Sequence, residues 1–306
     1  MLNEFYQNIG MKGYFDRYGV VNAIKRGMFV GNPVHIIKDY EIKKVLWQKY
    51  ASKRIRKYLK FQDTDPQGLS FNDDFKVENP IWIFWNTGME KAPKIVKKCY
   101  KTVLMYGGRP VIVLDENNID EYITFPKYIV NKTLSGNIPM AGYTDLMRFA
   151  LLEHYGGTWI DSTVLLSAPI SDVILDCNFF ALQNSMCLVN NPVLFAVWFL
   201  HAKSRDKTIR QIRNVAFAYW TKEECVIEYL LSNLIINEII TGTEIEKKIP
   251  YMNTDYSEYL IRCLGEDYDE AKLNWIFGLT NIHKLTYKLD KSISETNTMY
   301  NFIMNE

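Results

Sequence analysis

Residues 143–170, YTDLMRFALLEHYGGTWIDSTVLLSAPI, constrain the fold most because they join the signals of a helix, a turn and a strand. Apolar side chains such as Phe149 recur there at helical spacing. The pair Gly156-Gly157 ends that helix, since glycine readily adopts the backbone of a C-terminal cap. A short extended run then leads to Asp161 and continues into a second apolar run. The stretch therefore predicts helix, tight turn and strand, with a carboxylate at the strand end.

The polar side chains around this turn suit a ligand that carries hydroxyls and phosphates. Asp145 and Arg148 are three residues apart and therefore share one face of the helix. Asp161 lies at a strand end, where open α/β sheets collect their ligands. A nucleotide-diphosphate sugar needs acceptors for its hydroxyls and a cation for its diphosphate. The alternative is that Asp161 is an ordinary turn residue and that Asp145 and Arg148 form a surface ion pair.

A strand, a helix and a second strand are predicted earlier in the chain. Residues 81–85, IWIFW, form a short apolar run, residues 94–106 read as a helix, and residues 110–114 form the next strand. This order indicates a βαβ unit and an α/β fold. No dinucleotide or ATP fingerprint follows Trp85. Trp85 ends the first strand, so its ring either stacks on a uracil base or belongs to the core.

Composition excludes several classes of protein. The 306 residues have a net charge of +1, which gives no nucleic-acid signal, and 48% are hydrophobic, as in a packed globular protein. Five scattered cysteines without a CxxC pair argue against a zinc site or a disulfide framework. Neither a signal peptide nor a transmembrane run is visible, so we expect a cytoplasmic protein.

The N-terminal part is expected to be a helical extension. Residues 38–60 carry nine Lys and Arg against two acidic residues, a net +7, on a rough apolar stripe. Such a helix either contacts an anionic membrane surface or is a solvated face of a packed helix. The polar residues 62–80 read as a linker. We therefore divide the chain into residues 1–75, the extension, and residues 76–306, the catalytic domain.

The later part of the chain is expected to add one strand and several helices. Residues 179–182 read as a strand, followed by Gln183 and Asn184, whose amides either bond sugar hydroxyls or belong to an ordinary loop. Residues 192–201, 210–220 and 225–241 are expected to be helices.

Three motifs resemble those of one enzyme family. TDLMRFALLEHYGGTWIDSTVLLSAPI is similar to the core motif of the capsular polysaccharide synthesis glycosyltransferases, which resemble glycosyltransferase family 32 and, more distantly, the clostridial toxin glucosyltransferases. NPIWIFWNTGMEKAPKIVKKCYKTV (79–103) resembles the family's first strand and helix, and NIHKLTYK (281–288) its C-terminal His-Lys motif. The resemblance implies an α/β, GT-A-like, Rossmann-type nucleotide-sugar-binding domain with an N-terminal helical extension.

The resemblance also implies an activity. It predicts a retaining transferase that moves a hexose, with glucose or galactose favoured, from a UDP-sugar to a lipid-linked intermediate of a bacterial capsular or cell-surface polysaccharide. Such an enzyme acts in the cytoplasm at the inner face of the cell membrane, with peripheral contact through residues 38–60. The alternatives are a toxin-like transferase that glycosylates a protein, and a non-catalytic module that binds a nucleotide sugar.

The site residues follow from the same resemblance. Asp145, Arg148 and Asp161 are the expected catalytic residues. The expected nucleotide-sugar site consists of Trp85, Asp145, Arg148, Asp161, Thr163, Gln183, Asn184 and Lys284. Related enzymes carry Asp-X-Asp where this chain has Asp161-Ser162-Thr163, which removes one charged ligand for Mn²⁺ or Mg²⁺. Asp161 and His283 remain as the expected metal ligands.

Overall fold

A five-stranded mixed sheet forms the centre of the molecule. The structure, a computed structural model, describes residues 2–30, 40–184, 191–289, 293 and 297–305. The strand order is β3-β2-β5-β8-β7, from β2 (Ile81–Phe84), β3 (Val111–Leu114), β5 (Gly157–Ile160), β7 (Phe179–Gln183) and β8 (Phe195–Ala202). β2 is parallel to β3 and β5, whereas β8 is antiparallel to β5 and β7. The predicted βαβ unit and α/β class are confirmed.

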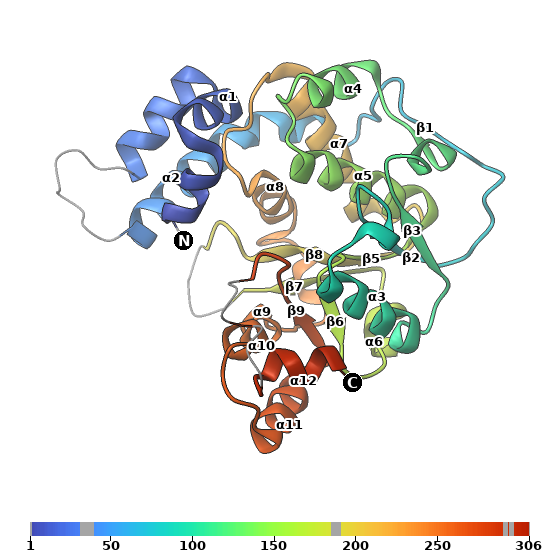
Figure 1. The fold of residues 1–306 in the computed structure, drawn as a ribbon. Coiled ribbons are helices and arrows are strands. Elements are labelled where there is room, and N and C mark those ends of the chain that lie inside the picture. Colours follow the sequence, from blue (N-terminus) through green and yellow to red (C-terminus); the bar gives the residue numbers. More distant parts are fainter. Residues whose placement is uncertain (1, 31–39, 185–190, 290–292, 294–296, 306) are drawn as a thin grey trace.

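Helices cover the sheet on two sides, and small sheets lie at its margins (Figure 1). The longer helices are α1 (Leu2–Val30), α2 (Tyr40–Ile55), α3 (Lys94–Tyr106), α4 (Lys127–Leu134), α5 (Met140–Tyr155), α7 (Lys207–Lys222), α8 (Leu231–Ile240), α11 (Glu270–Leu279) and α12 (Met299–Asn305). The short helical segments are η1 (Arg56–Phe61), η2 (Met89–Lys91), η3 (Ile119–Glu121), α6 (Asp172–Leu175), η4 (Glu246–Lys248), α9 (Thr254–Ser257) and α10 (Tyr259–Cys263). The marginal strands are β1 (Ser70–Phe71) with β4 (Ile123–Thr124), and β6 (Val164–Leu166) with β9 (Ile282–Lys284).

The predicted Gly-Gly turn is confirmed between α5 and β5. Gly156 and Gly157 have φ values of +73° and +98°, in the region that favours glycine. A Cβ atom on Gly157 would lie 2.0 Å from the carbonyl oxygen of Pro80. This close approach lets β5 enter the sheet beside β2 and brings Asp161 to its end.

The helix predicted over residues 192–201 is wrong, because Phe195–Ala202 is the strand β8. The strand lies between β5 and β7, and nearly all of its side chains are buried. A strand covered on both faces has no polar alternation, so its apolar run cannot be told from a buried helix by periodicity. The helix predicted over residues 225–241 is shorter than expected and begins at Leu231.

The N-terminal helices pack against the body of the molecule. α2 contacts α1 and α8, and Trp47, Ala51 and Ile55 on α2 are fully buried in the main core. Of the apolar stripe predicted there, Ile55 is buried, Val45, Tyr50 and Leu59 are partly buried, and Leu46 is 40% exposed. Contact of residues 38–60 with a membrane therefore stays a prediction, and residues 38 and 39 lie outside the described residues. The domain division at residue 75 stays a prediction. Among the described residues, no helix has both the length and the apolar character needed to cross a bilayer.

Candidate active site

A cleft of about 570 Å³ opens where β2 and β5 end. Its walls come from the ends of these strands and the segments after them, the first three turns of α5, part of β8, the start of α8 and the end of β9. Six of the expected site residues line it: Trp85, Asp145, Arg148, Asp161, Thr163 and Lys284. These residues span 200 positions of the sequence, so the fold brings together the three motifs that were singled out separately.

Asp161 is the centre of the charged network in this cleft. Its Oδ2 accepts a hydrogen bond from Nζ of Lys284 at 2.8 Å, and its Oδ1 accepts one from the indole of Trp159 at 2.9 Å. The guanidinium of Arg148 lies 3.5 Å from Oδ1. Burial by itself raises the pKa of Asp161, but the positive charges of Lys284 and Arg148 outweigh it and leave the pKa below its ordinary value. Asp161 is therefore a carboxylate at neutral pH.

Arg148 connects the two carboxylates of the site. Its NH2 group lies 3.1 Å from Oδ1 of Asp145, and its guanidinium carbon lies 4.9 Å from the centre of the Trp159 ring. It also donates to the carbonyl oxygen of Val197 in β8. The residue is 5% exposed, so these contacts fix the planar group in one orientation. Arg148 thus holds Asp145 and Asp161 at the cleft floor.

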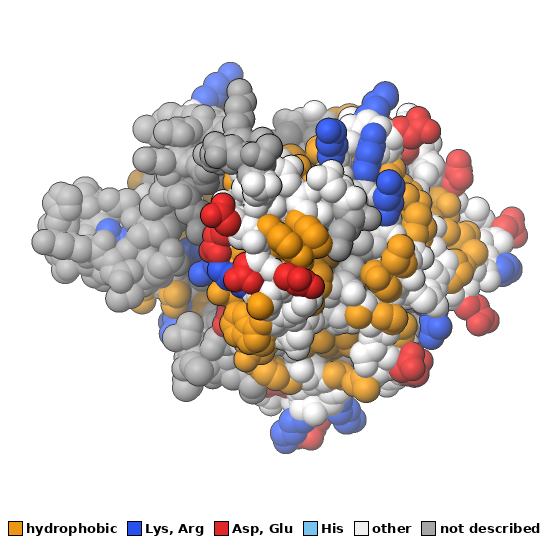
Figure 2. Space-filling view, turned by 60° about the horizontal axis from the view of Figure 1, so that its bottom comes forward, with side chains coloured by type: hydrophobic (Ala, Val, Ile, Leu, Met, Phe, Trp, Pro, Cys, Tyr) orange, Lys and Arg blue, Asp and Glu red, His pale blue; other side chains and the backbone are white. Residues whose placement is uncertain are grey.

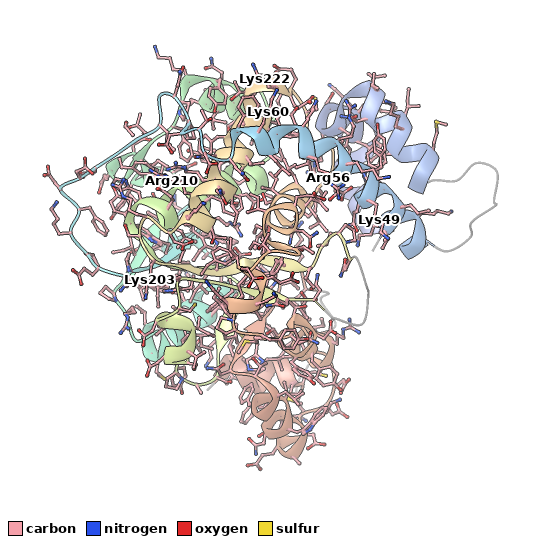
Figure 3. All side chains as sticks on the ribbon, turned by 180° about the vertical axis from the view of Figure 1, so that it is seen from behind. Lys49, Arg56, Lys60, Lys203, Arg210 and Lys222 are labelled. Carbon is pink, nitrogen blue, oxygen red and sulfur yellow. The ribbon has the colours of Figure 1, made fainter. Side chains whose placement is uncertain are left out.

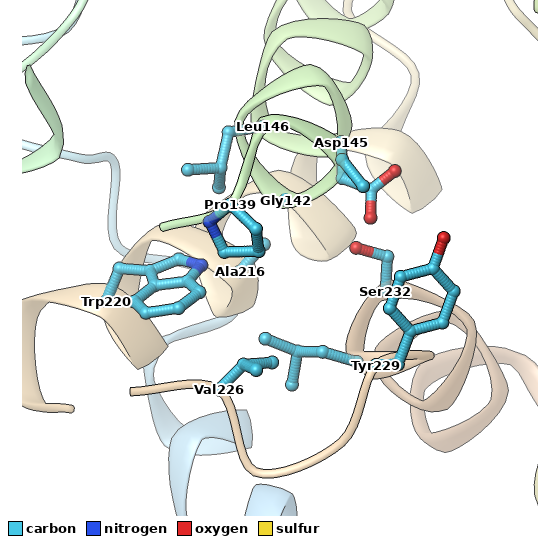
Figure 4. A pocket seen from close by; sticks show the side chains of 11 residues that line it. Pro139, Gly142, Asp145, Leu146, Ala216, Trp220, Val226, Tyr229 and Ser232 are labelled. Carbon is cyan, nitrogen blue, oxygen red and sulfur yellow. The ribbon is translucent and has the colours of Figure 1, made fainter. Parts of the chain in front are cut away.

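Asp145 lies between the cleft and a smaller pocket of about 20 Å³. Burial raises the pKa of its carboxyl above the ordinary value, although Arg148 and a hydrogen bond from Ser232 act in the opposite direction. Figure 4 shows the hydroxyl groups of Ser232 and Tyr229 on the side that faces the carboxylate of Asp145. Tyr229 before α8 and Ser232 in its first turn therefore complete the site on the side of α5.

Lys284 contacts Asp161 although it lies far along the chain, on β9. β9 pairs antiparallel with β6, with Lys284 opposite Val164, directly after the Asp161-Ser162-Thr163 turn. Besides its bond to Asp161, the ammonium group donates to Oγ1 of Thr163 at 2.9 Å. A lysine ammonium is a compact point charge suited to phosphate oxygens. The core motif, which contains Asp161, and the C-terminal His-Lys motif are thus joined through the ammonium group of Lys284.

These residues do not fit a divalent metal ion. The side-chain oxygens of Asp161 and Thr163 both accept hydrogen bonds from the Lys284 ammonium, which is positively charged and would repel a second cation there. No group of three His, Cys, Asp or Glu side chains suited to a metal is found in the part of the chain that the structure describes.

His283 does not line the cleft that contains Asp161, so the two expected metal ligands are not brought together there. Neighbouring side chains of a strand point to opposite faces, so His283 turns away from the side of β9 that carries Lys284 to the cleft. It is fully buried, it does not line the cleft, and its Nε2 lies 2.9 Å from Oγ of Ser167. Burial lowers its pKa to about 4, so the ring is neutral.

Trp85 is the aromatic residue of the cleft expected from the sequence. It lies directly after β2, and its ring meets that of Tyr287 edge to face at 5.3 Å. Trp82, three residues earlier, belongs to the core: it is fully buried and donates to the carbonyl oxygen of Gly156 at 3.0 Å. Trp85 therefore offers an aromatic ring on which a planar base could stack.

Gln183 and Asn184 are placed away from the cleft, contrary to their expected role. Gln183 is buried at the end of β7, and its backbone bridges to Asn253. The side-chain oxygen of Asn184 accepts a hydrogen bond from Thr254 at 2.6 Å. The backbone of Gln183 and the side chain of Asn184 thus join the end of β7 to the start of α9.

Sequence reasoning missed several polar and aromatic residues of the cleft. Tyr229 comes from the segment before α8, Asn233 from the first turn of α8, and Tyr287 follows β9. Asn233 donates to the carbonyl oxygen of Phe195 at 2.8 Å. Tyr287 lies inside the NIHKLTYK motif, which was a usable signal, whereas no motif marked Tyr229 or Asn233.

Most of the chain matches the model of one protein family. The model of the capsular polysaccharide synthesis protein family matches residues 32–303, which include every residue of the cleft. The chain belongs to this family. No curated protein matches this capsular polysaccharide synthesis protein at the level of sequence.

Solved structures of glycosyltransferases are similar to the family member described here. The PaToxG glycosyltransferase has 12% identity and a TM-score of 0.38, over 67% of this chain and 83% of that one. GlyE from Streptococcus pneumoniae has 12% identity and a TM-score of 0.38, over 75% of this chain and 63% of that one. The bifunctional glycosyltransferase WbbM has 9% identity and a TM-score of 0.40, over 77% of this chain and 52% of that one. The chain thus spans less than two thirds of the length of GlyE and WbbM.

Proposed function

We propose that this protein is a retaining glycosyltransferase that moves a hexose, glucose or galactose, from a UDP-sugar to a lipid-linked intermediate in capsular polysaccharide synthesis. The observation that supports this most is the Lys284–Asp161–Arg148 network in a cleft with an aromatic edge. A fixed cation, buried carboxylates and an aromatic ring are what a nucleoside diphosphate sugar requires. The reaction takes place on the cytoplasmic side of the cell membrane.

The donor lies with its base against Trp85 and its sugar over the cleft floor. The indole face stacks on the uracil ring, and the carboxylates of Asp145 and Asp161 accept hydrogen bonds from ribose and sugar hydroxyls. Arg148 keeps both carboxylates in place. The Lys284 ammonium then faces the diphosphate, near the oxygen atom that becomes negative as the sugar leaves.

The transfer itself is driven by stabilisation of this developing charge. The bond between the anomeric carbon and the phosphate oxygen breaks, and the acceptor hydroxyl forms the new bond from the same face of the sugar. Its proton passes to the departing phosphate oxygen, which balances the step. A preorganised cation at the leaving group is commonly the largest contribution of such a site. Lys284 takes the role that a Mn²⁺ or Mg²⁺ ion has in Asp-X-Asp enzymes, so no metal is needed.

The test is release of UDP from a panel of UDP-sugars, measured without an acceptor and then with lipid-linked or protein acceptors. We expect one UDP-hexose to be consumed, and Asp161→Asn to abolish the consumption while the fold is retained. Near-wild-type turnover by Asp161→Asn contradicts the assignment of the site. Transfer to a protein but not to a lipid-linked sugar favours the toxin-like alternative.

A non-catalytic nucleotide-sugar-binding module is the second candidate. It is favoured by Thr163, which stands where the related enzymes have their second acid. Such a module binds UDP in a calorimeter but neither hydrolyses nor transfers any UDP-sugar. Lys284 and Trp85 then have binding roles only.

A further inference from the structure

An exposed apolar surface lies on the second half of α1. Beyond Gly19, whose φ of +69° interrupts the regular helix, the exposed side chains are Val20, Val21, Ile24, Lys25 and Met28. The four apolar side chains are 52–66% exposed. Their spacing of one and four residues places them on one face of the helix. We call these four residues the α1 stripe.

The opposite face of this helix is packed against the rim of the cleft. Arg26 is buried and forms an ion pair with the buried Glu228 at 3.3 Å. Arg17 lies over the ring of Tyr229, 5.9 Å from its centre, and Tyr229 lines the cleft. Because α1 is held in this orientation, the α1 stripe faces outward as a defined part of the fold.

Charge is divided unequally between the N-terminal helices and the rest of the chain. Residues 1–61 contain 13 Lys and Arg against four Asp and Glu, a net +9, whereas residues 62–306 contain 23 against 31, a net −8. Exposed cations continue from α2 into η1: Lys49, Lys53, Arg54, Arg56, Lys57 and Lys60. Figure 3 shows Lys49, Arg56 and Lys60 along this part of the molecule. Arg56 and Lys57 pair with Glu238 and Glu223, and these acids only partly offset the excess.

We propose that the α1 stripe docks on the surface of an anionic lipid bilayer. Apolar side chains beside lysines on a helix are the pattern of an interfacial helix, which lies in the plane of the headgroups. The +9 segment is attracted to the negative surface, and the −8 remainder is repelled, so the charges orient the molecule with α1 toward the bilayer. A second copy of the chain fits this face poorly, because docking would bring two +9 segments together.

The rest of the surface supports this choice of face. Figure 2 shows a face on which hydrophobic side chains occur in groups, with both acidic and basic side chains among them. Such a mixture attracts an anionic bilayer less than the net +9 of residues 1–61 does. The docking surface goes beyond the proposed transfer reaction, since it concerns a different part of the molecule. Through Arg17 and Arg26 it also holds the Tyr229 side of the cleft close to the bilayer.

The test is flotation of the full chain with vesicles, which does not depend on any enzymatic activity. We expect binding to vesicles that contain phosphatidylglycerol, weaker binding to pure phosphatidylcholine, and loss of binding at 1 M salt, where charges are screened beyond about 3 Å. The variant Val21→Glu/Ile24→Glu should bind phosphatidylglycerol vesicles at least about tenfold more weakly, because it places two carboxylates in the docking face.

The matched control is Leu134→Glu/Val173→Glu, which changes two apolar residues on α4 and α6 that are 82% and 64% exposed, against 65% and 52% for Val21 and Ile24. The control should bind vesicles as the unchanged protein does. Equal binding by both double variants overturns the proposal, as does a lack of binding by the unchanged protein to phosphatidylglycerol vesicles. Thermal unfolding of each variant shows that it is folded. Vesicle binding without any turnover of UDP-sugars supports the docking surface and contradicts only the proposed function.

Discussion

The ammonium nitrogen of Lys284 lies 2.8 Å from Oδ2 of Asp161, although 123 positions separate the two residues in the sequence. The same nitrogen donates to Thr163, which takes the place of the second acid in an Asp-X-Asp motif. The ammonium group thus lies between the two oxygen atoms that the proposed site offers in place of an Asp-X-Asp pair. In the proposed reaction it supplies the positive charge of a metal ion.

We predict that turnover of the UDP-sugar is unchanged by EDTA and that Lys284→Ala lowers kcat/KM by about 10²–10³-fold. Removal of one preorganised group at the developing charge typically has an effect of this size. UDP release is measured with and without EDTA. Lys288→Ala, four residues on and exposed, is the control and should behave as the unchanged protein. Loss of turnover in EDTA would falsify the role given to Lys284.

A double variant also tests whether Lys284 takes the place of a metal ion. Thr163→Asp/Lys284→Ala restores the Asp-X-Asp pattern and removes the ammonium between its oxygens. We expect this variant to regain part of the lost turnover only when Mn²⁺ is added, because two carboxylates supply hard, charged ligands. A variant that stays equally inactive with and without Mn²⁺ shows that the place of the cation has been assigned wrongly.

A second prediction concerns Trp85 and the base of the donor. Trp85→Ala should weaken binding of UDP by about 1–3 kcal/mol, or roughly tenfold to a hundredfold, because stacking on an aromatic ring has this value per base. Isothermal titration calorimetry with UDP measures it. Trp275→Ala is the control, since Trp275 is 56% exposed on α11 and does not line the cleft. Equal affinities of the two variants would show that the base lies elsewhere.

Local sequence signals predicted the parts of the fold that local geometry determines. The Gly156-Gly157 turn was predicted because glycine readily ends a helix. The structure adds a second reason for glycine, since a Cβ atom on Gly157 would lie 2.0 Å from the carbonyl oxygen of Pro80. The strand β8 was not predicted, because a strand buried on both faces and a buried helix have similar apolar compositions. A prediction from periodicity fails where both faces of an element are covered.

The candidate site was predictable where a motif carried it and not where tertiary contacts created it. Asp161, Arg148 and Lys284 lie in recognised motifs and meet in one cleft. His283 shares a motif with Lys284, yet the alternation of the strand turns it the other way, which a list of residues cannot show. Tyr229 enters the cleft from the segment before α8, whose position depends on its contacts with α5 and α1.

We predict that the free energy of unfolding decreases as the pH is lowered from about 6.5 to about 4, because two histidines are buried as neutral rings. Burial lowers the pKa of His201 and of His283 to about 4. In the unfolded chain both bind a proton near pH 6.5, so acid favours that state, by at most about 3 kcal/mol for each ring. Chemical denaturation at a series of pH values measures the slope.

The variants His201→Asn and His283→Gln separate this effect from other titrations. Each amide can keep the hydrogen bond of the ring, to Thr158 or to Ser167, but cannot bind a proton. We expect each variant to flatten the decrease between pH 6.5 and pH 4. An unchanged slope in both would mean that other groups cause the loss of stability in acid.

The last prediction concerns the ion pair that fastens α1 to the rim of the cleft. Arg26 and Glu228 have side-chain exposures of 7% and 2%, so Glu228→Gln leaves a buried guanidinium without its carboxylate. Removal of one partner from a buried pair costs about 3–5 kcal/mol. The exposed pair Lys247–Glu244, also within salt-bridge distance, provides the control, and Glu244→Gln should change the stability by less than about 0.5 kcal/mol. Equal effects of Glu228→Gln and Glu244→Gln on urea denaturation would mean that α1 is not fastened through this pair. A large effect of Glu228→Gln alone, together with weaker UDP binding, would show that the position of α1 is transmitted to Tyr229, the next residue in the chain.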